Sequence, residues 1–173
     1  MNRITSPLLA SLVLLSSCSK DATASAPPAE STEKPAAPAE GAKPPASADM
    51  DAAIAQLMAK PEQATEKIEI QHILISFQGA PRMKDVTRTK DEAKVLAQEV
   101  YAEVIGGGDF DALVAKYTND SAPGIYKLTQ AGRKGMVQGF GDVGFRLQIG
   151  EIGVAPWDAK TSPYGWHIIK RLK

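Results

Sequence analysis

Cysteine and histidine are scarce in this chain. Among 173 residues there is one cysteine, Cys18, and there are two histidines, His72 and His167. Because Cys18 lies close to the start, the rest of the chain can form no disulfide, no thiolate metal site and no cysteine nucleophile. Neither charge is in excess, since 20 Lys and Arg balance 20 Asp and Glu. A nucleic-acid partner, which requires a strong basic excess, is therefore not expected.

Long apolar runs are also absent, and a membrane-spanning helix needs about 20 apolar residues. The longest run, residues 8–15, follows Arg3 and precedes Cys18, which is the order of an export signal. Residues 15–18, Leu-Ser-Ser-Cys, resemble the lipobox of bacterial lipoproteins, whose cysteine is lipidated and becomes the first residue after cleavage. We expect residues 1–18 to be a lipoprotein signal peptide. The alternative is an ordinary signal peptide with an incidental cysteine.

The next segment, residues 19–48, consists almost entirely of Ala, Pro, Ser, Thr, Glu and Lys. Such a composition cannot bury enough apolar surface to fold, so the sequence predicts a disordered tether. Residues 49–66 form a lead-in, in which residues 50–59 favour a short helix that Pro61 ends. With a lipid on Cys18, the tether would hold the following domain clear of a membrane of the bacterial cell envelope, on its periplasmic face or at the cell surface.

Residues 67–173 are expected to fold as one domain with a single core. Thr89 and Glu92 fit a capping box at the start of its first helix, and Asp109 can cap the second. The order strand, helix, helix, short strand, helix, strand, strand is typical of an α+β fold with helices packed on a small, mostly antiparallel sheet. The predicted strands are 68–77, 136–137, 152–157 and 166–172, with a third helix at 140–149 and an irregular stretch at 119–135.

Each histidine leads into a run of branched apolar residues, His72 into residues 73–75 and His167 into residues 168–169. Such runs mark short buried strands. Strands from the two ends of a compact domain often pair at its centre, so we expect the two imidazoles to meet across the sheet. The alternative role of both histidines is structural, shaping a site without acting in it.

The order and spacing of these features over residues 67–173 resemble the parvulin-type (PpiC) peptidyl-prolyl isomerases. Each match alone is weak, but six in register make chance an implausible explanation. The resemblance implies a parvulin-like α+β fold, with a small, mostly antiparallel four-stranded sheet surrounded by three to four helices. It implies no cofactor and no metal. The matching segments are 71–75 (Gln-His-Ile-Leu-Ile), 87–93, 108–113, 117–120, the set Met136, Phe140, Phe145, Leu147 and 150–151, and 162–169.

The resemblance also implies roles for individual residues. His72 and His167 would form the floor of the isomerase site, with Asp120 beside them as its acid. By composition these three could also bind a metal, but the family binds none there. Met136 and Phe140 would grip the proline ring, the first for its adaptability and the second for its flat area. The resemblance further implies a pocket wall at Leu128 and a hydroxyl near the second histidine at Ser162.

The function implied is an isomerase that speeds X–Pro rotation in unfolded or partly folded exported proteins. A monomer is expected, because nothing in the sequence suggests a heptad repeat or a swapped edge. One departure motivates an alternative, because residues 126–129 read Tyr-Lys-Leu-Thr where most members carry Gly-Asp-Leu-Gly. That alternative is a non-catalytic chaperone or peptide-binding module with the same fold. The alternative role of Asp120 is to cap or turn the chain, and the alternative role of Phe140 is to pack in the hydrophobic core. The cations interpreted as a solvated face rather than a phosphate-reading cluster are Arg82, Lys84, Arg88 and Lys90.

Overall fold

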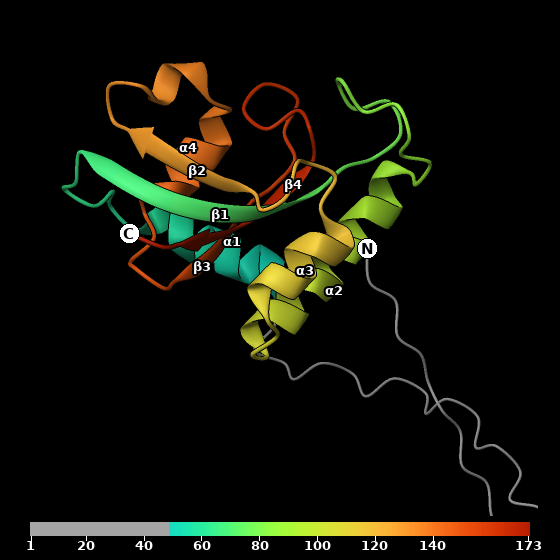
Figure 1. Ribbon diagram of the computed structural model, residues 1–173, viewed down its shortest axis with the longest axis horizontal. Helices are drawn as coiled ribbons and strands as arrows, with labels where there is room; N and C mark the ends of the chain where they lie inside the picture. Colours follow the sequence, from blue (N-terminus) through green and yellow to red (C-terminus); the bar gives the residue numbers. More distant parts are fainter. Residues whose placement is uncertain (1–48) are drawn as a thin grey trace, which may run out of the picture. The chain divides into compact units, whose positions relative to one another are not determined.

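The structure is a computed structural model that describes residues 49–173 (Figure 1). The signal peptide predicted at 1–18, its lipidation site Cys18 and the tether predicted at 19–48 lie outside the described residues. Within residues 49–173, no helix combines the length and the apolar character needed to cross a membrane.

Four strands form one antiparallel sheet in the order β2-β1-β4-β3. β1 (Lys67–Ile75) and β4 (Trp166–Arg171) lie side by side at its centre, so the strands that carry the two histidines pair as the sequence predicted. β2 (Ile125–Thr129) borders β1, and β3 (Ile152–Ala155) borders β4. The predicted α+β fold with a four-stranded sheet is confirmed.

Helices cover both faces of this sheet (Figure 1). They are α1 (Met50–Ala59), α2 (Lys90–Ile105), α3 (Phe110–Tyr117) and α4 (Gln138–Gly144), with a 3-10 turn, η1 (Arg133–Gly135). α2 and α3 pack on one face, in a buried cluster with Ile73 and Ile75 of β1. α4 packs on the other face, in a second cluster with Ile70 and Ile169. Because side chains alternate along a strand, His72 and His167 both project toward the α4 face.

The short helix α1 packs beside β3 through Leu57. Asp49 caps this helix by accepting two backbone N–H groups of its first turn at 3.0 and 3.1 Å. An added Cβ on Gly153 would lie only 2.5 Å from Leu57 Cδ2, so the close approach of α1 to β3 depends on glycine there. Met50 and Leu57 are both buried, and the core therefore includes residues from before residue 67.

The strand predicted at 136–137 does not form, and a strand forms instead at 125–129, where an irregular stretch was predicted. The 67–71 half of β1 needs hydrogen-bond partners on the side away from β4, because buried backbone groups are rarely left unpaired. β2 supplies them, pairing Tyr126 with Ile70. The order of the elements was predicted correctly, but the position of the short strand was wrong.

The third helix is shorter than predicted and is shifted toward the N-terminus. It was expected at 140–149, but α4 ends at Gly144 and Phe145 is its C-cap. Three of the seven residues of α4 are glycine, a poor helix former. The following residues return as a turn toward β3, and Leu147 is nevertheless fully buried.

Replacing Thr89 with alanine is expected to lower the free energy of unfolding by about 1 kcal/mol. The predicted capping box is present: Thr89 Oγ1 accepts the Glu92 N–H at 3.2 Å, and Glu92 Oε2 accepts the Thr89 N–H at 2.7 Å. Urea unfolding measures the change. Thr87→Ala, on an exposed residue just before α2, is the control and should have almost no effect; an equal loss in both variants would contradict the capping role.

Candidate active site

The two histidines meet on the α4 face of the sheet. In the β1–β4 register His72 lies opposite Ile169 and His167 lies opposite Leu74, so the histidines are diagonal neighbours. The Nδ1 atoms of His72 and His167 are 3.1 Å apart, and the two rings are nearly parallel at 12°. Both side chains are buried. The imidazoles thus meet across the sheet, as the sequence predicted.

Asp120 extends this pair into a chain of hydrogen bonds. Its Oδ2 lies 3.0 Å from His72 Nε2 and accepts the Tyr126 hydroxyl at 2.7 Å. Its Oδ1 accepts the Ser121 N–H at 2.8 Å. The hydrogen bond from His72, followed by that from Tyr126, holds the pKa of the Asp120 carboxyl well below its usual range. An ionised carboxylate only accepts hydrogen bonds, and this sets the direction of the whole chain.

The proton positions follow from that direction. With the Asp120 carboxylate as acceptor, His72 Nε2 carries a hydrogen, and in a neutral ring His72 Nδ1 is then an acceptor. His167 Nδ1 must donate to it, which leaves His167 Nε2 as a bare lone pair. Among the side chains that the structure describes, this nitrogen is the one buried nitrogen or oxygen that lacks a partner. No cluster of three or more His, Cys, Asp or Glu in the described part of the chain is arranged to hold a metal ion.

The segment that carries Asp120 is tied to β1 and to the loop before α2. Thr118 Oγ1 accepts a backbone N–H of β1 at 3.1 Å, and Asn119 Oδ1 accepts the Ser76 N–H at 2.9 Å. Arg88 donates to the same Asn119 oxygen at 2.7 Å and to the Ser76 carbonyl at 2.9 Å. The interpretation of Arg88 as part of a solvated face is therefore wrong, because its guanidinium is bonded between these two residues.

A cleft of about 990 Å³ opens beside the histidine pair. Its lining includes all three predicted catalytic residues and two of the predicted substrate-binding residues, Met136 and Phe140. The Phe140 ring meets the His72 ring edge to face, with centroids 4.9 Å apart, and the His167 ring at 5.4 Å. The cleft therefore combines apolar and aromatic side chains with one carboxylate, Asp120.

Two predicted substrate-binding residues do not line this cleft. Leu128 is 3% exposed and lies in the core cluster with Ile68 and Phe140. Ser162 is 1% exposed, and its hydroxyl donates to the Gly165 carbonyl at 3.2 Å. Each side chain is committed to the interior, so neither contacts the cleft directly.

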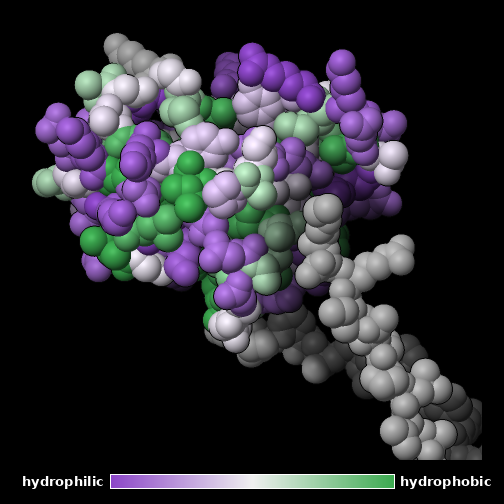
Figure 2. Space-filling model, viewed as in Figure 1, coloured by the Kyte–Doolittle hydropathy of each residue, from purple (hydrophilic) through white to green (hydrophobic). Residues whose placement is uncertain are grey.

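Two loops form the rim of the cleft. Arg82 and Met83 come from the loop between β1 and α2, and Lys160 and Tyr164 from the loop between β3 and β4. In Figure 1 both loops rise on the same side of the sheet as η1. The face seen in Figure 2 mixes apolar patches with polar side chains. Arg82 is exposed, as expected for a solvated face, but it also lines the cleft, and Tyr164 lies in the matching segment 162–169. Met83 and Lys160 carry no local sequence signal, because loop residues come together only through the fold.

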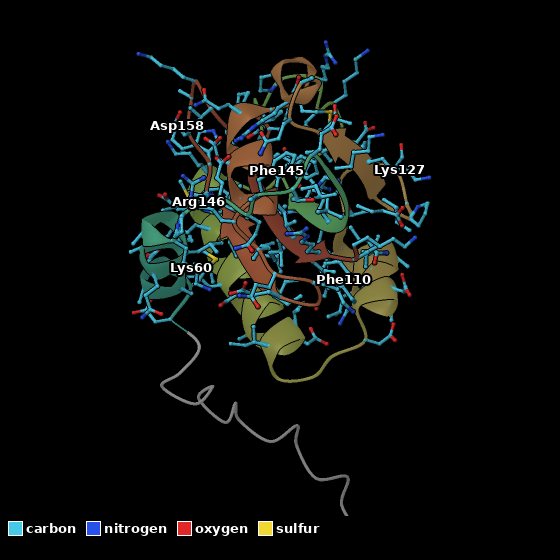
Figure 3. All side chains as sticks on the ribbon, turned by 90° about the vertical axis from the view of Figure 1, so that its left-hand side faces the viewer. Lys60, Phe110, Lys127, Phe145, Arg146 and Asp158 are labelled. Carbon is cyan, nitrogen blue, oxygen red and sulfur yellow. The ribbon has the colours of Figure 1, made fainter. Side chains whose placement is uncertain are left out.

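The helix side of the cleft is held by an ion network. Arg133 of η1 donates to Glu62 at 2.7 and 3.1 Å and also bonds Asp142 of α4. Arg146 donates to the Glu62 carboxylate at 3.0 Å and to the Lys60 carbonyl at 3.1 Å. Figure 3 shows Lys60 and Arg146 on the same side of the molecule. Glu62 lies in the segment before β1 and bonds Arg133 of η1, which in turn bonds Asp142 of α4. These bonds connect the three segments.

Stability should fall below neutral pH because His167 is buried as the neutral base. Burial lowers the pKa of His167 to about 3, whereas an unfolded histidine titrates near 6.5. Between these values the unfolded chain binds one more proton. The stabilisation is complete above about pH 6.5 and declines as pH falls toward 3, by about 1.4 kcal/mol per pH unit.

Urea unfolding at pH 6.5, 5.5 and 4.5 tests this pH dependence. His167→Asn removes the titrating ring. The free energy of unfolding of this variant should therefore change less between pH 5.5 and 4.5, by about 1.4 kcal/mol per pH unit. Equal slopes in the wild type and in His167→Asn would show that another group causes the loss.

The chain is similar in sequence to one protein family and to two characterised relatives. The model described as "PPIC-type PPIASE domain" matches residues 53–173. Foldase protein PrsA 1 of Lactobacillus johnsonii is 30% identical over 111 residues, covering 62% of this chain and 31% of the relative. Chaperone SurA of Pseudomonas fluorescens is 28% identical over 112 residues, covering 64% of this chain and 24% of the relative. The chain thus spans about a quarter to a third of the length of these relatives.

Solved structures share the fold at low identity. The solution structure of TbPIN1 matches with a TM-score of 0.53 at 23% identity, over 63% of this chain and 99% of that one. The peptidyl-prolyl isomerase ESS1 from Candida albicans matches with a TM-score of 0.52 at 21% identity, over 71% of this chain and 74% of that one.

Proposed function

The chain belongs to the PPIC-type PPIase domain family, the parvulin type of peptidyl-prolyl isomerase, and from this premise we propose that it catalyses rotation about X–Pro bonds in unfolded or partly folded exported proteins. The observation that carries the proposal is the cleft in which Asp120, the histidine pair, Met136 and Phe140 come together. The names of the relatives, a foldase and a chaperone, support unfolded chains as the substrate class.

The reaction needs no bond to break. Rotation about the X–Pro amide is opposed by resonance, which gives a barrier of about 18–20 kcal/mol. A catalyst must bind the twisted amide better than either planar form. A 1,000-fold acceleration requires only about 4 kcal/mol of such preference. We propose that an apolar slot and one fixed charge supply this preference.

The residues of the cleft suit these two requirements. Resonance in the planar amide places negative charge on the carbonyl oxygen, and the Asp120 carboxylate would disfavour that form when the carbonyl lies near it. Met136 and Phe140 would hold the proline ring while the preceding carbonyl turns. His72 and His167 would orient the carboxylate through the hydrogen-bond chain described above. The residues of the cleft would supply this chemistry without a cofactor.

We also propose that the protein is anchored to a membrane of the bacterial cell envelope. The support is the lipobox-like sequence that ends at Cys18 and the Pro/Ala-rich segment at 19–48. Mass spectrometry of the intact protein from its native host tests this proposal. We expect a diacylglyceryl-modified Cys18 as the first residue; an unmodified cysteine would exclude the anchor.

A second candidate function is a chaperone without isomerase activity. It is favoured by the departure from the family pattern at residues 126–129 and by the similarity to a relative named a chaperone. Under this alternative the cleft would bind extended chains without lowering the rotation barrier. A well-folded protein that binds unfolded chains but leaves X–Pro exchange unchanged would support the chaperone and exclude the isomerase.

A matched pair of variants tests whether catalysis occurs in this cleft. Phe140 and Phe145 are both buried in the same core cluster, but only Phe140 lines the cleft. Phe140→Leu is expected to lower kcat/KM for a proline tetrapeptide about two- to tenfold, since an aromatic contact contributes about 0.5–1.5 kcal/mol. Phe145→Leu should lower the free energy of unfolding about as much as Phe140→Leu does, and it should leave kcat/KM unchanged. Equal kcat/KM in the two variants would contradict catalysis at the cleft.

A further inference from the structure

Tyr126 lines the cleft, although it was not among the site residues expected from the sequence. Its hydroxyl donates to Asp120 Oδ2 at 2.7 Å, and the same oxygen lies 3.0 Å from His72 Nε2. The Asp120 side chain is 33% exposed, so burial alone does not fix its orientation. Two hydrogen bonds that converge on one carboxylate oxygen from different strands restrict its rotation. Tyr126 and His72 together therefore hold Asp120 in one orientation at the cleft.

The Tyr126 ring forms part of the cleft wall. It meets the His72 ring edge to face with centroids 5.3 Å apart at 82°, and the Phe140 ring at 5.7 Å and 90°. The His72 and Phe140 rings are also in edge contact, at 4.9 Å. The three rings thus support one another at one corner of the cleft, in the geometry that aromatic pairs prefer.

The register of β2 explains why Tyr126, and not Leu128, stands at this wall. Tyr126 pairs with Ile70, which neighbours His72 on the same face of β1, whereas Leu128 pairs with Ile68. Two residues along a strand correspond to about 7 Å. Leu128 is therefore displaced away from the histidine pair and into the core.

We propose that Tyr126 is a positioning and specificity residue of this site: its hydroxyl fixes the Asp120 carboxylate, and its ring is the wall against which the proline-containing segment packs. This inference rests on the proposed isomerase function. It also gives the departure at residues 126–129 a role, because Tyr126, which replaces the glycine of most family members, forms the wall of the cleft. Burial raises the pKa of the Tyr126 hydroxyl to about 12, so it remains a donor at neutral pH.

Kinetics of the full chain separate the two roles. Tyr126→Phe removes only the hydroxyl and should lower kcat about tenfold with KM within about twofold, because a hydrogen bond to a charged group is lost. Tyr126→Ala removes the ring as well and should also raise KM about fivefold or more. Tyr117→Phe is the control, since the Tyr117 hydroxyl faces Glu103 at 3.4 Å rather than Asp120; its kcat and KM should equal those of the wild type.

Each role can be overturned separately. A wild-type kcat in Tyr126→Phe would overturn the role of the hydroxyl, and an unchanged KM in Tyr126→Ala would overturn the wall. If Tyr126→Ala does not fold, Tyr126→Leu removes the ring but keeps some apolar volume, and it should raise KM by a smaller but measurable factor of about twofold or more; an unchanged KM would overturn the wall. If the wild type itself has no turnover, the proposed function fails. The wall is then tested by titrating a proline peptide, whose affinity Tyr126→Ala must lower for the assignment to stand.

Discussion

Asp120→Ala is expected to lower kcat/KM for proline peptides about 100-fold, the scale on which removing one preorganised group from an active site acts. The carboxylate is the one negative charge in the lining of the cleft, and three hydrogen bonds hold it there. Its loss should remove the electrostatic preference for the twisted amide while leaving the apolar slot of Met136 and Phe140 in place. Binding of unfolded chains should therefore persist in the variant.

Two further variants make this test specific. Asp120→Asn keeps the shape but removes the charge, so it should lose nearly as much activity if the charge is what matters. Asp91→Ala removes an exposed carboxylate from the first turn of α2 and should leave turnover unchanged. Parallel assays of peptide exchange and of binding to an unfolded protein measure both properties. Full activity in Asp120→Asn would contradict the electrostatic role.

Gly165→Ala is expected to lower the free energy of unfolding by about 3 kcal/mol or more, which is among the largest single-residue effects. Gly165 has a positive φ of 143°, and an added Cβ would lie 2.2 Å from the Ile75 carbonyl oxygen and 2.9 Å from Ser76 Cα. Both contacts are with backbone, so no side chain can move aside. Because Gly165 directly precedes β4, relief of the clash would push apart the two central strands that carry the histidines.

A series of glycine variants separates the clash from backbone strain. Gly150→Ala introduces only strain, because its φ is +82° and nothing lies within 4 Å of the added Cβ; it should cost about 1 kcal/mol. Gly135→Ala introduces neither a clash nor backbone strain, so it should leave the free energy of unfolding nearly unchanged. Urea unfolding ranks the three variants, and a loss in Gly165→Ala no larger than in Gly150→Ala would contradict the close packing at that position.

Local signals predicted the parts of the fold that depend on neighbours in sequence. The capping box of Thr89 and Glu92 and the cap at Asp109 lie where they were expected. The two histidine strands were also recognised, because each is a dense run of branched apolar residues. Their pairing followed from their positions at opposite ends of the domain, and it brought His72 and His167 together as predicted.

The parts that were missed depend on contacts that distant residues make. The five residues of β2 contain only a weak alternation, and the strand exists because β1 has an open edge beside it. The register of β2 then decides that Tyr126 reaches the cleft and Leu128 does not. Arg88 was misinterpreted for the same reason, since its partner Asn119 comes from a segment 31 residues further along the chain. Sequence pattern alone does not specify such pairings.

Exchange spectroscopy on Ala-X-Pro-Phe peptides, with and without the full chain, tests directly whether the protein is an isomerase. Uncatalysed exchange takes about tens to hundreds of seconds, so acceleration by a catalytic amount of protein is easily resolved. We expect acceleration that depends on the residue X, because the carbonyl of X would lie near Asp120. An unchanged exchange rate for every peptide, with a well-folded protein, would contradict it.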